Sequence, residues 1–324
     1  MWLTWATGLV AVFLLAALLT WCARGYALRR NLFDQPGERR SHTVATPRGG
    51  GIAIVLSQLL AYAVIGVVRV EFAAMLAVFS AGLMLVAGVG WWDDHRPLSA
   101  RFRLCVHVVA GVLLGTLVWQ ANGDAFKAVF SALLAIGLIN VWNFMDGING
   151  LATTQAILAA IAFALLLPLP DAGIALLLVA ACLGFLPFNF PKARIFMGDV
   201  GSGALGYLLA GLVALGITVT DIAWPVWLVP LAAFLVDSGF TLLVRMFKGE
   251  RWMEAHTQHL YQACVKRGCS HAAVTLYYAL FSFAGLTLCA ASGGLSPAWA
   301  SMMALAWAII GFCIWYTLRN RVVR

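Results

Sequence analysis

Charged side chains are scarce in this sequence. Asp, Glu, Lys and Arg together make up only 10% of its 324 residues, whereas 63% of the residues are hydrophobic. A soluble domain carries about 25% charged and about 45–50% apolar residues. No soluble fold of this length could bury so much apolar surface. The composition therefore excludes a soluble protein and predicts that lipid surrounds most of the chain.

Cysteine pairs with the spacing of metal ligands are also missing. The seven cysteines are scattered along the chain and form no CxxC pair, so neither a zinc site nor a disulfide framework is indicated. The formal net charge of +8 would suggest nucleic-acid binding if the chain were soluble. In a membrane protein, basic residues gather on cytoplasmic loops, so we expect no nucleic-acid partner.

Long apolar runs, separated by charged or turn-rich breaks, fill the sequence. Because a membrane span needs roughly 20 mostly apolar residues, the runs predict an all-α integral membrane protein of about eleven transmembrane helices. We expect one domain over residues 1–324. The predicted spans are 3–22, 51–68, 73–91, 102–119, 127–144, 151–168, 173–190, 201–218, 225–245, 273–291 and 298–317. The first run lacks a basic n-region, so it predicts a span rather than a signal peptide.

Basic residues are distributed unequally between the two sides that these spans define. With the N-terminus outside, 19 of the 21 Lys and Arg residues fall on cytoplasmic segments, and only Arg69 and Lys127 fall outside. Such an asymmetry sets the orientation of a membrane protein. The sequence therefore predicts an outside N-terminus and a cytoplasmic C-terminus.

Aspartates at the predicted cytoplasmic ends of spans are the most informative residues. Asp93 and Asp94 follow the third span in WWDDHRPL, Asp146 follows the fifth in NFMDGINGL, and Asp199 precedes the eighth in IFMGDVGSG. One such acid could be an ordinary solvated loop residue, but several at one membrane face favour a shared site. Asp237 lies inside the ninth span, where an ionisable group is expensive and usually functional.

Oxygen ligands without a cage of Cys or His indicate a hard cation. Asn143 and Asp146 are three residues apart and so share a helix face, and Asn149 can reach the same cavity. Asp and Asn oxygens suit Mg²⁺ or Mn²⁺, and Mg²⁺ completes its shell with water and substrate phosphate. Adjacent residues such as Asp93 and Asp94 point about 100° apart on a helix, so we expect them to have different roles. The pattern predicts a site for a nucleotide diphosphate.

Other polar features allow both a functional and a structural explanation. Glycines at the cytoplasmic starts of spans, such as Gly51 and Gly201, either expose a helix N-terminus to an anion or permit close helix packing. Basic residues of the first loop either bind a phosphate group or orient the protein. His256 and His259, expected on one helix face, either contact substrate or are interfacial histidines. The basic loop residues are Arg39, Arg40, His42 and Arg48.

Together these segments resemble the polyprenyl-phosphate N-acetylhexosamine-1-phosphate transferases, in the branch that includes the undecaprenyl-phosphate GlcNAc-1-phosphate transferase. The resemblance covers about residues 34–262. It rests on DQPGERRSHTVATPRGGG, WWDDHRPLSARFR, NFMDGINGL, FMGDVGSG and AHTQHLYQ, which follow one another in the family's order.

The resemblance implies a role for each matching residue. It implies catalytic roles for Asp93, Asp94 and Asp146, and Asp94 and Asp199 as ligands of Mg²⁺, with Mn²⁺ an alternative. The implied substrate-binding residues are Arg39, Arg40, His42, Arg48, Asn143, Asn149, Lys192, His256 and His259. Asp93 is expected to position substrate or to act as a base.

The implied reaction transfers an N-acetylhexosamine 1-phosphate from a UDP-sugar to undecaprenyl phosphate, with release of UMP. It would take place among membrane lipids at the cytoplasmic face of a bacterial inner membrane, in a chain that could form a homodimer. Asn149 stands where many relatives have a second Asp, and HTQH is sparser than the HHH run of the pentapeptide translocase. The second difference favours enzymes that initiate O-antigen or similar glycans.

Two other functions remain open from the residues alone. A multi-spanning transporter of a lipid-linked or nucleotide-linked substrate would place ionisable groups near the bilayer midplane, and here His107 and Asp237 are the main charges within spans. A conventional glycosyltransferase would release UDP rather than UMP. The sequence does not identify the sugar: GlcNAc, FucNAc and QuiNAc all fit.

Overall fold

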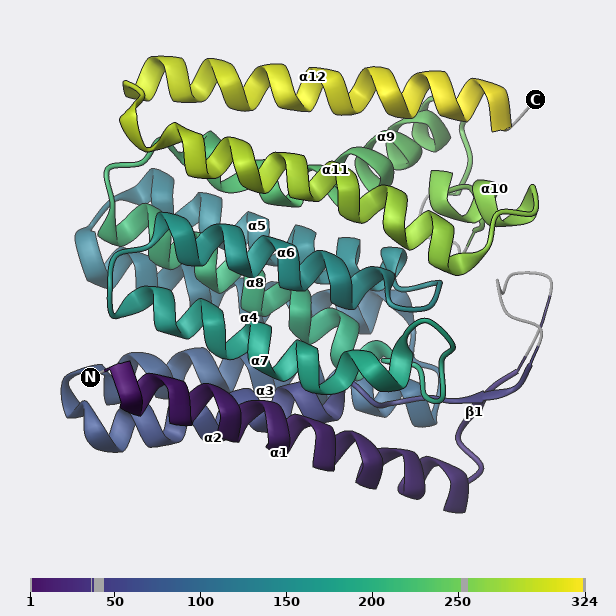
Figure 1. The fold of residues 1–324 in the computed structure, drawn as a ribbon, viewed down its shortest axis with the longest axis horizontal. Coiled ribbons are helices and arrows are strands. Elements are labelled where there is room, and N and C mark those ends of the chain that lie inside the picture. The colour runs from purple at the N-terminus through teal and green to yellow at the C-terminus, as the bar shows by residue number, and fades with distance from the viewer. Residues whose placement is uncertain (1, 36, 38–43, 252–255, 323–324) are drawn as a thin grey trace.

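The computed structural model describes residues 2–35, 37, 44–251 and 256–322, and long, roughly parallel helices dominate it (Figure 1). Within those residues, nine helices are long and apolar enough to cross a membrane. Two shorter apolar helices, Ile52–Val68 and Leu151–Leu166, complete a set that coincides with the eleven predicted segments. The all-α, multi-pass architecture is thereby confirmed. The number of crossings stays a prediction, because 17 and 16 residues lie at the short end of what a span needs.

The elements follow the predicted runs along the chain. The first half contains α1 (Trp2–Arg29), β1 (Phe33–Asp34), β2 (Thr46–Pro47), α2 (Ile52–Val68), η1 (Val70–Phe72), α3 (Ala73–His95), α4 (Ala100–Asn122) and α5 (Ala125–Met145). The second half contains α6 (Leu151–Leu166), α7 (Asp171–Asn189), α8 (Asp199–Val219), η2 (Trp224–Leu231), α9 (Ala232–Phe247), α10 (Leu260–Lys266), α11 (His271–Ala291), η3 (Ser292–Gly294) and α12 (Pro297–Val322).

Three features differ from the predicted pattern. The ninth span is divided into the 3₁₀-helical η2 and the α-helix α9, because Pro225 and Pro230 each remove a backbone N–H donor. The short helix α10 follows the histidine pair. A two-stranded antiparallel sheet pairs Phe33 with Pro47 and Asp34 with Thr46 in the first long loop.

Polar residues set where several helices begin. The Ser99 hydroxyl accepts a hydrogen bond from the N–H of Phe102 at the start of α4, and the Asp124 carboxylate accepts one from the N–H of Lys127 at the start of α5. Each cap satisfies one backbone donor that the helix itself leaves free. These caps turn a continuous series of apolar runs into separate helices with defined ends.

Helix α8 lies at the centre of the bundle. Its most apolar window is 89% buried inside the protein, against 17% for α1 and 22% for α12, which therefore face lipid over most of their surface. Helices α3 and α5 pack on α8 at glycine positions: Gly90 of α3 lies against the Asp199 backbone, and Gly206 of α8 lies against the Leu138 backbone. Small residues allow such close approach in membranes, where apolar burial alone does not drive helices together.

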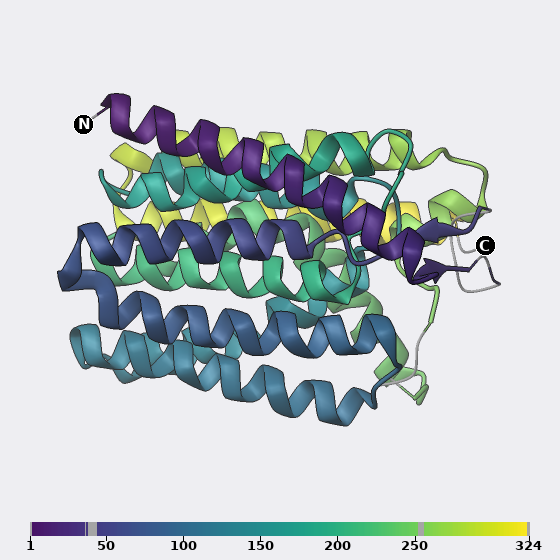
Figure 2. The ribbon, with the colours of Figure 1, turned by 90° about the horizontal axis from the view of Figure 1, so that it is seen from below.

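The two termini lie at opposite ends of the bundle (Figure 1). The end with the C-terminus also carries β1 and α10, and the connections there are longer than those at the other end (Figure 2). The last turns of α3 and α5 and the first turn of α8 meet at this end. All the predicted catalytic aspartates therefore belong to one end of the molecule.

Replacement of Gly90 by alanine tests the packing of α3 on α8. A Cβ atom at Gly90 would overlap the backbone of Asp199 and Val200, whereas one at Gly88, two residues earlier on the same helix, meets no heavy atom within 4 Å. Overpacking typically destabilises by about 1–3 kcal/mol. We expect Gly90→Ala to lower the melting temperature of the detergent-purified protein. Gly88→Ala should leave the melting temperature equal or slightly higher, and equal effects of the two variants would contradict the described packing.

Candidate active site

A cavity of about 750 Å³ opens near α10, where α3 and α5 end and α4 and α8 begin. Among the described residues, five aspartates and two arginines line it, together with three histidines. The charged and titratable lining residues are Asp34, Arg48, Asp93, Asp94, Arg103, His107, Asp146, Asp199, His256 and His259. The carboxylates thus outnumber the guanidinium groups, so the cavity is acidic unless a cation joins them.

Asp94 fixes the start of the central helix. Its two carboxylate oxygens accept hydrogen bonds from the backbone N–H groups of Asp199 and Val200, each at 3.1 Å. Gly198, at φ +75°, provides the turn before α8, and a side chain there would meet the Asp94 carboxylate. The anion at the α8 N-terminus is therefore the protein's own Asp94, which helix N-termini favour electrostatically. Asp94, one of the predicted metal ligands, therefore has a structural role whether or not it also binds a metal ion.

Asp93 and Asp199 share one arginine. Nη1 of Arg103 donates to Asp93 Oδ2 at 3.0 Å and to Asp199 Oδ2 at 2.6 Å. Asp93 Oδ1 also accepts from the N–H of Leu98 at 2.6 Å, which closes the turn between α3 and α4. The adjacent Asp93 and Asp94 thus point to different partners, as the 100° helical rotation predicts.

Among the aspartates that line the cavity, Asp146 has the fewest described polar contacts. It follows the last residue of α5, and no hydrogen bond or ion pair to its carboxylate occurs among the described residues. Burial, with the nearby charges of Asp199, Asp94 and Asp34, raises the pKa of Asp146 well above its ordinary value. Carboxylates crowded in this way ionise together only when a cation neutralises them.

The segment before Asp146 is held to α8. The Asn143 amide donates to the Ser202 hydroxyl at 3.2 Å, and Asn143 also lines the cavity. The indole of the adjacent Trp142 donates to the Ala152 carbonyl of α6 at 3.3 Å. These contacts set the direction in which α5 delivers Asp146, and they confirm that Asn143 and Asp146 face one cavity.

Arg48 is the described residue of the basic loop that reaches the cavity. Its guanidinium donates to the Asp94 carbonyl, and Nε lies 4.0 Å from Asp94 Oδ1. Strand β2 brings it there, because the N–H of Phe196 donates to the Pro47 carbonyl at 2.7 Å. The other basic residues predicted to bind substrate, Arg39, Arg40 and His42, lie outside the described residues.

His256 and His259 come together without sharing a helix. Both precede α10, so their predicted position on one helix face is wrong; the chain is extended at the N-cap His259. Their ring centroids are nevertheless 4.7 Å apart, and both line the cavity. Burial and the neighbouring His259 lower the pKa of His256 to about 4, and burial lowers that of His259. A lowered pKa favours the uncharged form of both rings, which can form hydrogen bonds but adds no positive charge.

Two predicted substrate-binding residues are not brought to the cavity. Asn149 donates from its amide to the Pro191 carbonyl at 3.0 Å, and Lys192 is exposed on the same loop; neither lines the cavity. The structure adds Arg103 and Asp34, which the sequence analysis did not single out. Both lie within the motifs WWDDHRPLSARFR and DQPGERRSHT, so proximity to a motif was the available signal.

The glycine segments mainly serve close packing. The N–H groups of Gly50 and Gly51 donate to the carbonyls of Phe196 and Met197, at 2.9 and 2.8 Å. Gly51 also lies against Gly201, where a Cβ atom would overlap the other backbone. The structural explanation of these glycines holds, and their backbone N–H groups are not free to bind an anion.

The donor set suits a hard cation with an incomplete protein shell. Among the described residues, no three His, Cys, Asp or Glu side chains form a ready metal cluster. Mg²⁺ needs less, because one or two carboxylates suffice when water and phosphate fill the other positions. Two carboxylates could hold it: that of Asp146, which has no partner among the described residues, and that of Asp199, whose described hydrogen bond comes from the Arg103 side chain.

Residues 76–217 match the family model described as glycosyl transferase family 4. They run from the third predicted span into the eighth and include four of the five lining aspartates. A Mycolicibacterium smegmatis protein named decaprenyl-phosphate N-acetylglucosaminephosphotransferase is 31% identical over 326 residues, covering 83% of this chain and 79% of its own length. The chain belongs to this family. The resemblance expected from the motifs is thereby confirmed.

Other members are similar over shorter stretches. The Mycobacterium tuberculosis protein of the same name is 32% identical over 238 residues, which is 62% of this chain and 59% of that relative's length. A Deinococcus radiodurans phospho-N-acetylmuramoyl-pentapeptide-transferase is 32% identical over 259 residues, 68% of this chain and 78% of its own. Family membership therefore spans relatives whose names specify different sugar substrates.

Asparagine substitutions separate the structural from the chemical aspartates of this family member. Asp94→Asn keeps the shape of the side chain but replaces the carboxylate that accepts hydrogen bonds from two backbone N–H groups. A hydrogen bond to a charged group contributes about 1.5–3 kcal/mol to stability. We expect Asp94→Asn to lower the melting temperature clearly. Asp146→Asn breaks no bond to a described residue and relieves like-charge repulsion, so its melting temperature should equal or exceed that of the wild type. A destabilised Asp146→Asn protein would contradict the description of that carboxylate.

Proposed function

We propose that this family member transfers an N-acetylhexosamine 1-phosphate from a UDP-sugar to undecaprenyl phosphate, releasing UMP and starting a lipid-linked glycan of the cell envelope. The observation that carries the proposal is the acidic cavity at one end of a membrane bundle. An excess of carboxylates cannot attract two anionic substrates unless a divalent cation bridges them. Phosphoryl transfer between a nucleotide sugar and a lipid phosphate has that requirement.

The proposed location is the cytoplasmic face of the bacterial inner membrane. Eleven spans with the N-terminus outside would put the end that carries the cavity in the cytoplasm, because nearly all Lys and Arg residues belong to that side. The position of the termini at opposite ends is consistent with an odd number of spans (Figure 1). A soluble nucleotide sugar and a lipid headgroup could meet only at such a boundary.

Mg²⁺, or Mn²⁺ in its place, is the proposed cofactor. Asp146 and Asp199 would hold it, and when bound it would supply positive charge to the pyrophosphate and to the departing UMP. Arg103, which donates to Asp199 at the edge of the same cavity, would be positioned to bind a phosphate oxygen of the substrate. Asp94 keeps the first turn of α8 in place meanwhile.

The proposed reaction is an attack by an oxygen of the lipid phosphate on the β-phosphorus of the UDP-sugar. A new P–O–P link forms to the lipid, and the bond from the β-phosphorus to the bridging oxygen breaks, so that this oxygen leaves with UMP. A phosphate monoester with a second pKa near 6 is already mostly dianionic at neutral pH, so the attack needs no strong base. Asp93, bonded to Leu98 N–H and Arg103, is accordingly proposed to orient Arg103.

The proposed sugar is an N-acetylhexosamine without an attached peptide. Two features support this choice: the HTQH histidine segment, and the names of the mycobacterial relatives, which specify N-acetylglucosamine phosphotransferases. The route that the glycan follows afterwards, O-antigen or another envelope polysaccharide, depends on which sugar is used.

A substrate panel tests the reaction. The purified protein in nanodiscs is given undecaprenyl phosphate, Mg²⁺ and one UDP-sugar at a time: UDP-GlcNAc, UDP-FucNAc, UDP-QuiNAc or UDP-MurNAc-pentapeptide. We expect UMP and a polyprenyl-pyrophosphoryl-sugar with one of the first three, measured by chromatography and mass spectrometry. Asp146→Asn should release no UMP and serves as the control for contaminating hydrolases.

Each other outcome of the panel has a defined meaning. Release of UDP instead of UMP would indicate transfer of the sugar alone, and turnover of the pentapeptide substrate only would refute the proposed sugar. Movement of a nucleotide sugar or lipid across proteoliposomes without any product lipid would favour a transporter.

Cation binding has its own test, independent of turnover. With UDP present, we expect Mg²⁺ or Mn²⁺ to raise the melting temperature of the wild type, and EDTA to reverse the rise. Asp146→Asn and Asp199→Asn should each reduce this shift, because each removes a charged ligand. Ser282→Ala, which loses a buried hydroxyl bonded to Gln155 of α6, is the control: neither residue lines the cavity, so the full shift should remain. A shift of equal size in all variants would refute the proposed ligands.

A further inference from the structure

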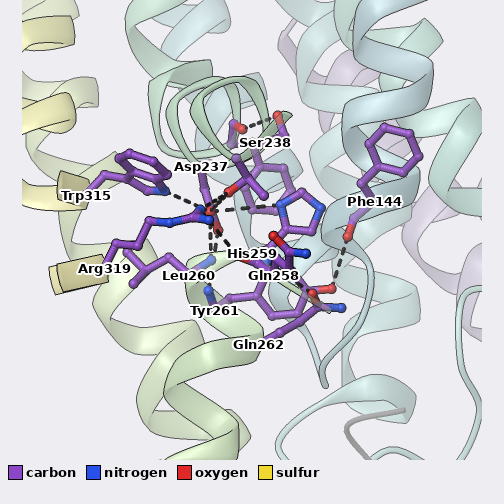
Figure 3. A network of polar contacts seen from close by, with 12 residues as sticks. Phe144, Asp237, Ser238, Gln258, His259, Leu260, Tyr261, Gln262, Trp315 and Arg319 are labelled. Carbon is purple, nitrogen blue, oxygen red and sulfur yellow. Dashed lines mark hydrogen bonds and ion pairs between the residues drawn. The ribbon is translucent and has the colours of Figure 1, made fainter. Parts of the chain in front are cut away.

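The charged residue inside the ninth predicted span is buried at a junction of four helices (Figure 3). Asp237 of α9 is only 1% exposed. A carboxylate in such a place is stable only when hydrogen bonds replace its lost water. The hydrogen-bond partners of Asp237 therefore indicate its role.

Five donors from four helices satisfy this carboxylate. Oδ1 accepts from Leu260 N–H at 2.8 Å, from the Trp315 indole at 3.1 Å and from the Thr241 hydroxyl at 3.3 Å. Oδ2 accepts from the Tyr278 hydroxyl at 2.6 Å and from Tyr261 N–H at 3.4 Å. These donors belong to α9, α10, α11 and α12, so one side chain joins all the helices of the C-terminal part.

Two of the five donors are the first backbone N–H groups of α10. The residue before them is the N-cap His259, whose Nδ1 lies 4.0 Å from Asp237 Oδ1 and whose backbone N–H donates to the Gln262 side chain. Arg319 of α12 supports the same segment, donating to the Gln258 carbonyl at 3.5 Å and to the Thr241 hydroxyl at 3.0 Å. The histidine side of the cavity is thus held by α9 and α12.

Tyr261 connects the segment held by Asp237 to the end of α5. Its hydroxyl donates to the Phe144 carbonyl at 3.0 Å (Figure 3). Its ring also lies against Gly147, where a Cβ atom would overlap the hydroxyl. Phe144 and Gly147 enclose Asp146 in the sequence. A shift of Tyr261 would therefore move the turn that presents Asp146.

We propose that Asp237 is a positioning residue: it fixes the segment His259–Gln262 and, through Tyr261, the turn that carries Asp146. It touches neither substrate nor metal in this role. It acts on the alignment of the histidines with the carboxylates, for which displacements of about 1 Å can lower rates by about a hundredfold. The inference rests on the proposed function only where turnover is the measurement.

The test combines turnover with hydrogen exchange on the full-length protein. Asp237→Asn keeps the size of the side chain but replaces one accepting oxygen with a donor. We expect kcat per folded molecule to fall between about tenfold and a hundredfold at temperatures well below melting, with KM for the UDP-sugar changed less than about threefold. We also expect faster amide exchange in peptides over both 258–263 and 143–149.

A pair of tyrosine variants keeps the test decisive if Asp237→Asn does not fold. Tyr261→Phe loses the bond to Phe144, whereas Tyr207→Phe, in buried α8, loses a hydroxyl that has no hydrogen-bond partner among the described residues. Tyr261→Phe should lower kcat and loosen 143–149, and Tyr207→Phe should do neither. Because Asp237 and Tyr261 act in series, the effects of Asp237→Asn and Tyr261→Phe on kcat should not multiply in the double variant.

Specific results would overturn the inference. Normal kcat in folded Asp237→Asn, with a lower melting temperature alone, would reduce Asp237 to a stabilising residue. Faster exchange in 258–263 with unchanged exchange in 143–149 would break the proposed link. If the wild type releases no UMP, the proposed function fails separately, and the exchange measurements still decide the role of Asp237.

Discussion

The bond between the Asp94 carboxylate and the first two N–H groups of α8 is the contact on which the site depends. It joins the end of α3 to the start of the most buried helix, and it leaves no room for a side chain at Gly198. Because Asp199 is the first residue of that helix, the bond that stabilises the bundle also fixes the position of a second carboxylate. The packing of α3 on α8 and the position of the Asp199 carboxylate thus depend on the same hydrogen bonds. A shift of either helix would change both.

Among the described residues, that arrangement places more carboxylates than guanidinium groups around the cavity. Asp93 and Asp199 share the one guanidinium of Arg103, and Asp146 has no described partner. Burial lowers the pKa of both histidines, which disfavours the protonated form that could pair with the carboxylates. An acidic pocket is unsuited to a nucleotide diphosphate on its own, but it suits a nucleotide diphosphate that arrives with a divalent cation. The excess of carboxylates among the described residues therefore supports the proposed cation site over a simple anion-binding pocket.

The parts of this picture that depend on local sequence were predictable. Apolar runs fix the helices, and Asp146 and Asp199 stand out because acids at the ends of spans are few. The remainder depends on contacts between distant segments. From the local sequence, Arg103 on the first turn of α4 cannot be distinguished from a basic residue that only sets the orientation of the protein in the membrane. Tyr261 reaches Phe144 across 117 positions, which no local pattern encodes. Pro225 and Pro230 mark the break before α9, but the apolar run that contains them predicts one continuous span.

An ionisable residue within a span is usually taken as a sign of transport or proton movement. At Asp237 the surroundings argue otherwise. A carboxylate offers about four lone-pair sites, and five donors already converge on this one, two of them backbone groups that cannot turn away. No capacity remains for a passing ion, and release of the donors would detach α10 from α9, α11 and α12. The hydrogen bonds that make Asp237 unsuitable as an ion carrier also make it a rigid anchor. The proposed phosphoryl transfer requires such rigidity, because it depends on precise alignment of the two sides of the cavity.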